Sequence, residues 1–142
     1  MRISDVLRQK GSAVATIAPD VTVRELISTL RAHNIGATVV TDGDAVVGIV
    51  SERDIVRKLD ERGADLLSAP VSEIMTRDVF TCAPEDTVDS LAETMTERRI
   101  RHMPVLRDGR LAGIVSIGDV VKSHIRQLTT DREQLESYIA HG

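Results

Sequence analysis

The chain contains the same sequence unit twice. When the sequence is shifted by 65 residues, segment 14–19 falls on segment 79–84, and the heptapeptide Gly-Ile-Val-Ser-x-x-Asp at 48–54 falls on its own repeat at 113–119. Self-similarity at a fixed period indicates a repeated supersecondary unit. One copy of about 55–60 residues would be a marginal fold by itself. We therefore predict that the two copies pack into one pseudo-twofold unit.

The leading segments of the two copies match at a different shift. Residues 3–7 match residues 71–75 at a shift of 68, so the first copy has a loop that is three residues longer, around residues 9–12. Gly63 and Pro70 mark the connection between the copies. The predicted divisions are a first copy at 1–60, a linker at 61–70, a second copy at 71–126 and a C-terminal helical extension at 127–142.

Each copy is predicted to be a β-α-β-β-α unit, an α/β fold in which a small sheet is packed by two helices. The first strand ends at a proline, which cannot continue a ladder, and apolar residues then recur at helical spacing. Thr22 and Glu25 have the spacing of a capping box, and Asp108-Gly109 predicts a tight hairpin turn. The predicted strands are 14–17, 37–41 and 45–50 in the first copy and 79–82, 103–106 and 110–115 in the second, and the last helices open near Ser51 and Ser116.

The repeated heptapeptide lies at a strand-to-helix junction. The unpaired N–H groups and the dipole of a helix N-terminus favour an anion, so a phosphate could bind beside Ser51 or Ser116. Asp54 and Asp119 follow about one turn later, where a carboxylate could accept two hydroxyl hydrogen bonds from a ribose. The alternative is that each serine is an ordinary N-cap and each aspartate a first-turn partner of the helix dipole.

Composition excludes several other classes of function. A net charge of −4 argues against broad nucleic-acid binding, which requires clustered Lys and Arg. Phe80 and Tyr138 are the only aromatic residues apart from histidine, which argues against aromatic stacking platforms. A single cysteine excludes an internal disulfide, and the histidines have no metal-ligand spacing. The chain lacks a membrane-length apolar run and a signal sequence, so we expect a cytoplasmic protein without a membrane contact.

With these motifs in place, the chain resembles a tandem pair of CBS domains (cystathionine-β-synthase repeats), an arrangement known as a Bateman module. The resemblance rests on the leading segments, the strand-then-proline units, the strand His102-Met103-Pro104-Val105 and both heptapeptides, and it covers residues 3 to about 126. It implies that a ligand containing adenosine binds in the cleft between the repeats. AMP, ADP or ATP is the leading class, with S-adenosylmethionine or NAD as alternatives.

The resemblance also implies roles for individual residues. Asp54 and Asp119 would bind ribose hydroxyls, and Ser51 and Ser116 would bind phosphate. The backbone of two strands would meet adenine, and Arg101 and His102 would contact phosphate from the second copy, as Arg53 would from the first. The strand residues in question are Thr16, Ile17, Thr81 and Cys82.

The two clefts are not expected to be equivalent, and one of them could be empty. The cations Arg101 and His102 occur only in the second copy, where the first has Gly36 and Ala37, while Arg53 occurs only in the first. We therefore expect the clefts to differ at the phosphate end. Cys82 corresponds to Ile17 at the shift of 65 residues, so we expect Cys82 to be a small core residue and not a nucleophile.

The predicted function is that of a stand-alone regulatory module, not an enzyme, with no required cofactor and no metal. Its output would pass through an unknown target protein or through its own oligomeric state. The rival is a structural interaction module with vacant clefts.

The tail has apolar residues at 4-3 spacing with a predicted break near residues 129–131, and we expect it to form a homodimer contact rather than to fold back on its own module. The tail residues expected to contribute are Ile125, Leu128, Leu135 and Ile139.

Overall fold

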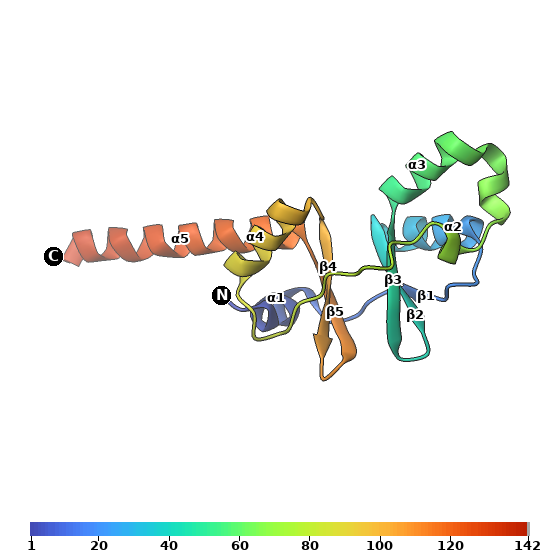
Figure 1. Ribbon diagram of the computed structural model, residues 1–142. Coiled ribbons are helices and arrows are strands. Elements are labelled where there is room, and N and C mark those ends of the chain that lie inside the picture. The colour runs from blue at the N-terminus through green and yellow to red at the C-terminus, as the bar shows by residue number, and fades with distance from the viewer. Residues whose placement is uncertain (142) are drawn as a thin grey trace.

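The computed structural model describes residues 1–141 as two α/β halves that lie side by side, with a long helix projecting from one of them (Figure 1). The prediction of two related α/β units is confirmed. In chain order the elements are α1 (Ile3–Lys10), β1 (Thr16–Ile17), α2 (Val23–His33), β2 (Ala37–Asp42), β3 (Ala45–Ser51), α3 (Glu52–Arg62), η1 (Gly63–Ser68), η2 (Val71–Glu73), α4 (Val88–Arg98), β4 (His102–Arg107), β5 (Arg110–Ser116) and α5 (Ile117–His141).

The two sheets are close copies of each other, with one difference. The first sheet has the order β1-β2-β3, with β1 parallel to β2 and β2 antiparallel to β3. In the second half β4 and β5 form the same antiparallel hairpin, but the predicted strand 79–82 is reduced to a single bridge between Cys82 and Val105. The prediction of a full strand there was therefore wrong.

Local sequence signals explain where the helices and turns begin and end. The hydroxyl of Thr22 accepts a hydrogen bond from the Glu25 N–H (3.3 Å) and caps α2, and Thr87 caps α4 in the same way. Asp108 and Gly109 both have positive φ, as a type I′ hairpin turn requires, so the predicted turn is confirmed.

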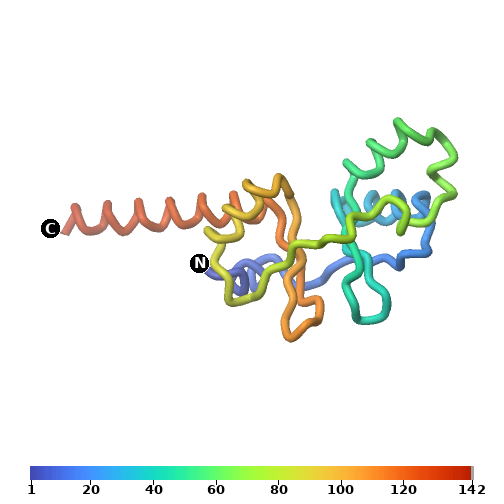
Figure 2. The backbone as a smooth tube through the Cα atoms, viewed as in Figure 1, coloured from blue at the N-terminus to red at the C-terminus, as the bar shows by residue number. Residues whose placement is uncertain are grey.

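The leading segment of each copy packs into the opposite half. In α1, Ile3, Val6 and Leu7 are buried with Val115 and other residues of the second half. Conversely, the segment containing Val71, Ile74 and Met75 is buried in the core of the first half. The chain therefore crosses between the halves twice, once after α1 and once after η2, as Figure 2 shows. The folded halves therefore do not coincide with the copies predicted at 1–60 and 71–126.

The segment predicted as a linker at 61–70 is structured. Helix α3 continues to Arg62, and residues 63–68 form η1, whose Leu66 is fully buried in the first core. Gly63, with φ of 64°, only ends α3. The connection is folded because Leu66 packs on the first sheet and covers part of its apolar surface.

Helix α5 is continuous from Ile117 to His141, so the predicted break near residues 129–131 was wrong. No Pro or Gly interrupts residues 119–141. Instead, one i,i+4 pair spans the expected break, since Gln127 donates to Asp131 (3.0 Å), and a second follows it, in which Arg132 pairs with Glu136 (3.0 Å). Beyond Ser123 every described residue of α5 is exposed, and the helix extends away from its own half (Figure 1) instead of folding back on it.

Candidate functional site

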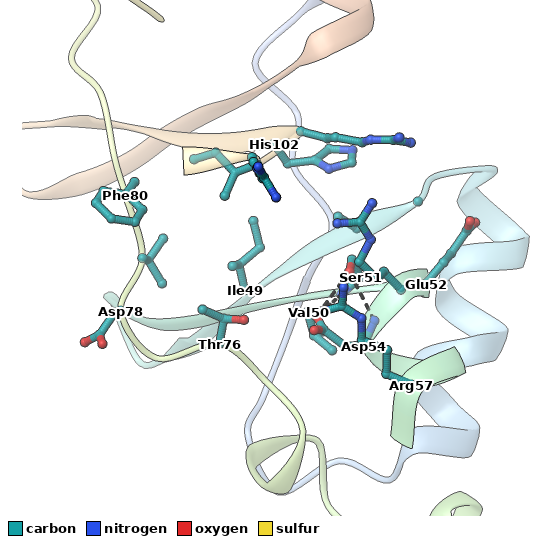
Figure 3. A pocket seen from close by; sticks show the side chains of 17 residues that line it. Ile49, Val50, Ser51, Glu52, Asp54, Arg57, Thr76, Asp78, Phe80 and His102 are labelled. Atoms are coloured by element: carbon teal, nitrogen blue, oxygen red, sulfur yellow. Dashed lines mark hydrogen bonds between the residues drawn. The ribbon is translucent and has the colours of Figure 1, made fainter. Parts of the chain in front are cut away.

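A pocket of about 380 Å³ lies between the two copies. Its volume falls within the range of small-molecule sites, about 300–1,000 Å³. Phe80 and Asp78 lie at one end, and Ser51, Glu52 and Asp54 lie at the other (Figure 3). The first copy contributes Gly36, Ala37, residues 49–54 and Arg57, and the second contributes Thr76, residues 78–80 and residues 99–102.

The start of α3 places a serine and a carboxylate together in this pocket. Asp54 Oδ2 accepts hydrogen bonds from the Ser51 N–H (2.8 Å) and the Ser51 hydroxyl (3.1 Å), while Ser51 Oγ accepts one from the Asp54 N–H (3.4 Å). These bonds form a capping box, so the N-cap alternative describes the local geometry. Within residues 1–141 the bonds of the carboxylate use Oδ2, which leaves Oδ1 to accept hydroxyl groups from a ligand.

Cations from both copies surround the same cavity. Arg53 and Arg57 come from the first turns of α3, and Arg99 and Arg101 come from the segment between α4 and β4. The structure therefore brings Arg101 of the second copy into one pocket with Asp54 of the first. Arginine forms charge-assisted and often bidentate contacts with phosphate, so this part of the lining suits a phosphorylated ligand.

His102 lines the pocket from the first residue of β4, where its register partner is Ser116 of the second heptapeptide. Burial lowers the pKa of His102, and the positive charges of Lys10 and Arg101 lower it further, while Asp119 and Glu52 oppose them. The side chain is therefore mainly neutral at pH 7 and can accept or donate a hydrogen bond, but it adds little positive charge for a phosphate.

Phe80 is a pocket residue that the sequence did not predict. It is 40% exposed, lies near the apolar side chains of Ile49 and Val79, and carries the Arg98 guanidinium 4.8 Å from its ring centroid. Low aromatic content argued against a stacking platform, but one of the two aromatic residues lines this cavity. A base could pack on the free part of this ring.

The adenine-reading residues predicted in the strands do not line this pocket. Cys82 N–H donates to the Pro104 carbonyl (3.0 Å) and its carbonyl accepts from the Leu106 N–H (2.9 Å), so the bridge to β4 uses its backbone. Thr81 precedes it and is not part of the lining, which stops at Phe80. In the first copy Thr16 and Ile17 are paired with β2. The lining of this pocket therefore ends one residue before Thr81.

The second heptapeptide has the same capping box and one additional partner. Asp119 Oδ2 accepts from the Ser116 N–H (2.8 Å) and hydroxyl (3.1 Å), and also from Lys10 Nζ (2.7 Å). Burial alone would raise the pKa of Asp119, but the hydrogen bonds from Lys10 and Ser116 lower it below its usual value. Neither Ser116 nor Asp119 lines the pocket described above. The two motifs therefore differ at the carboxylate itself, in addition to the difference in cations expected at the phosphate end.

Comparison with known proteins assigns both copies to one family. The family model of the CBS domain matches residues 3–61 and 71–125. The mitochondrial CBS domain-containing protein CBSX3 of Arabidopsis thaliana is 36% identical over 149 residues, covering 99% of this chain and 72% of that protein. The crystal structure of the CBS-domain containing protein ATU1752 from Agrobacterium tumefaciens has a TM-score of 0.85 at 49% identity, covering 87% of this chain and 99% of that one.

The similar structures include complexes with ligands. The CBS domain pair of protein MJ0100, in complex with 5′-methylthioadenosine and S-adenosyl-L-methionine, has a TM-score of 0.80 at 27% identity and covers 89% of this chain and 98% of that one. Both of those ligands contain adenosine. In the part of this chain that the structure describes, no helix combines the length and the apolar character that crossing a membrane requires.

Proposed function

The chain belongs to the CBS-domain family, whose paired domains are regulatory ligand-binding modules, and from that premise we propose that it senses an adenine nucleotide, AMP, ADP or ATP. The nucleotide binds in the pocket between the two copies. The observation that carries this proposal is the joint presence of Asp54, four arginines and Phe80 around one cavity of about 380 Å³.

Each part of a nucleotide has a matching feature in the lining. The Asp54 carboxylate accepts the ribose hydroxyls through Oδ1, and Ser51 keeps that carboxylate in position through two hydrogen bonds. The apolar end formed by Phe80 and Ile49 covers the base. Arg53 and Arg101 contact the phosphate, which is desolvated between them.

The arginines also distinguish between the alternative ligands. S-adenosylmethionine, which is present in the MJ0100 complex, carries a positive sulfonium where AMP carries phosphate oxygens. The cavity is lined by four arginines, Arg53, Arg57, Arg99 and Arg101, and by three carboxylates, Glu52, Asp54 and Asp78. The surplus of positive charge favours the phosphate over the sulfonium. NAD contains the same adenosine part as AMP and carries a second nucleotide as well.

The proposal includes a route for the signal. We infer that two chains associate through α5, because Leu128, Leu135 and Ile139 are 68%, 60% and 69% exposed on a helix that projects from the body. Residues at 4-3 spacing form a coiled-coil seam. Ligand binding would then act on a target protein through this dimer, and the chain itself would catalyse no reaction.

Calorimetric titration tests the ligand. The wild-type chain is titrated with AMP, ATP, adenosine and S-adenosylmethionine, and the nucleotides should bind most tightly. Asp54→Ala should weaken AMP and adenosine alike because both contain the ribose. Asp60→Ala is the matched control, since Asp60 is an exposed carboxylate of α3 that does not line the pocket. Binding of none of the four probes would favour the interaction module with vacant clefts.

A further inference from the structure

Lys10, the last residue of α1, places its ammonium group against Asp119 of the second heptapeptide, the carboxylate expected to bind a ribose in the second cleft. Its Nζ donates to Asp119 Oδ2 (2.7 Å) and to the Ile114 carbonyl oxygen (2.8 Å). The side chains of Lys10 and Asp119 are 32% and 14% exposed, so the ion pair is largely withdrawn from water. Such a partly buried, charge-assisted pair is stronger than a surface one.

The first copy satisfies the equivalent groups differently. Ile49 corresponds to Ile114 at the 65-residue shift, and its carbonyl accepts from the backbone N–H of Thr76 (2.8 Å). Asp54 corresponds to Asp119 and has no ion-pair partner among residues 1–141. A lysine side chain therefore occupies, in the second half, a place that backbone holds in the first. Lys10 lies next to the three extra residues of the first copy.

A second contact also distinguishes the two clefts. Ala15, which corresponds to Phe80, has its carbonyl oxygen occupied by the buried hydroxyl of Thr38 (2.6 Å). Met103 stands at the position of Thr38 in the second copy and has no hydroxyl with which to do the same. In the second cleft, side chains of the chain itself thus bind two groups that a ligand would use. Lys10 binds the carboxylate of Asp119, which corresponds to the ribose-type Asp54, and Thr38 binds the carbonyl of Ala15, which corresponds to Phe80 where a base would lie.

We propose that Lys10 fills the second cleft as an internal counter-ion, so that the chain binds one adenosine-type ligand, in the Asp54 pocket, and gains a second site when Lys10 is removed. This inference rests on the proposed function. Lys10 Nζ lies against the Asp119 carboxylate, so a ligand that binds this carboxylate competes with the ammonium group, and separating a partly buried ion pair is unfavourable.

Calorimetric titration of the full chain with AMP and with adenosine tests the proposal by stoichiometry. The wild type should bind one equivalent, and Lys10→Met should bind two. Lys58→Met removes an exposed lysine that pairs with Glu61 on α3, and this control should keep one equivalent. Two double variants then identify the sites: Lys10→Met/Asp54→Ala should keep one equivalent at Asp119, and Lys10→Met/Asp119→Ala should keep one at Asp54.

The other outcomes separate the two proposals. Two equivalents in the wild type, or one equivalent in both the wild type and Lys10→Met, would overturn the role of Lys10 and leave the nucleotide pocket standing. Binding by neither protein would overturn the proposed function and this inference together. Circular dichroism and the melting temperature of Lys10→Met establish that the variant is folded at the titration temperature.

Discussion

Gly48 packs so closely against Met75 that a Cβ on Gly48 would lie 2.6 Å from the methionine sulfur and 3.0 Å from the Thr76 carbonyl oxygen. The equivalent Gly113 packs against Leu7 in the other half, where a Cβ would lie 2.6 Å from one methyl group. Each glycine therefore leaves room for the leading segment of the opposite copy, and a methyl group at either position tests how tightly that segment is held.

We expect Gly48→Ala to lower the free energy of unfolding by about 1–3 kcal/mol, the usual cost of overpacking a core. Gly113→Ala should cost less, because Leu7 is a side chain that can shift, whereas the Thr76 carbonyl belongs to the backbone paired with Ile49. Urea denaturation of both variants measures the difference. An equal or reversed order would show that the backbone contact at Thr76 does not limit the space.

Arg101→Ala should weaken AMP binding by about 10- to 100-fold, the equivalent of losing one charge-assisted contact of about 1.5–3 kcal/mol. Adenosine has no phosphate and should bind the variant nearly as well as it binds the wild type. Arg53→Ala should show the same pattern more weakly, and Arg110→Ala, an exposed arginine of β5 outside the pocket, is the control. Equal losses for AMP and adenosine would remove Arg101 from the phosphate site.

The stability of the chain should decrease as the pH falls below about 6.5, in part because of His102. Burial lowers the pKa of His102 in the folded state below its ordinary value of 6.5, so the unfolded chain takes up a proton first and is favoured as the pH falls. The loss is complete once the pH is below the folded pKa. His102→Gln should flatten the dependence of unfolding free energy on pH between 7.5 and 5.5, and an unchanged dependence would remove His102 as its cause.

Cys82 should be unreactive in the folded protein. Burial raises the pKa of its thiol to about 12, and the negative charge of Asp86 adds to the effect, so almost no thiolate is present at pH 8. Iodoacetamide should therefore modify Cys82 only when the chain is unfolded in urea. Rapid modification of the native protein, followed by mass spectrometry, would contradict the buried placement.

Replacing Leu128 and Leu135 together with glutamate should convert a dimer into a monomer, because both exposed leucines lie on the predicted seam of α5. The double variant Thr130→Glu/Gln134→Glu adds the same charge to the opposite face of the helix and should remain dimeric. Light scattering at tens of micromolar chain measures the mass of each. A monomeric wild type would remove α5 from the signalling route.

The repeat, the hairpins and the helix starts could be predicted because they depend on residues that are close in sequence. Thr22, Asp108 and Gly109 act within four residues of their partners. The exchange of leading segments could not be predicted, because residues 3–7 and 71–75 have the same apolar pattern and either could cover either sheet. Phe80 was missed for the same reason, since it reaches the pocket through the crossing segment. The break predicted near residues 129–131 does not occur, because no Pro or Gly lies there to end α5.

The exchanged leading segments also bear on how such a molecule can arise. In the present chain, Leu7 fills the space beside Gly113, and Met75 fills the space beside Gly48. A single copy, with one sheet and one leading segment, leaves the space beside its glycine unfilled unless the leading segment of a second molecule enters it. The simplest self-sufficient ancestor is therefore a pair of identical short chains that swap their first helices. Joining two such chains end to end turns that exchange between molecules into one within a single polypeptide, and it frees each half to change independently. Lys10, at whose place the second copy has no lysine, is an example of such an independent change.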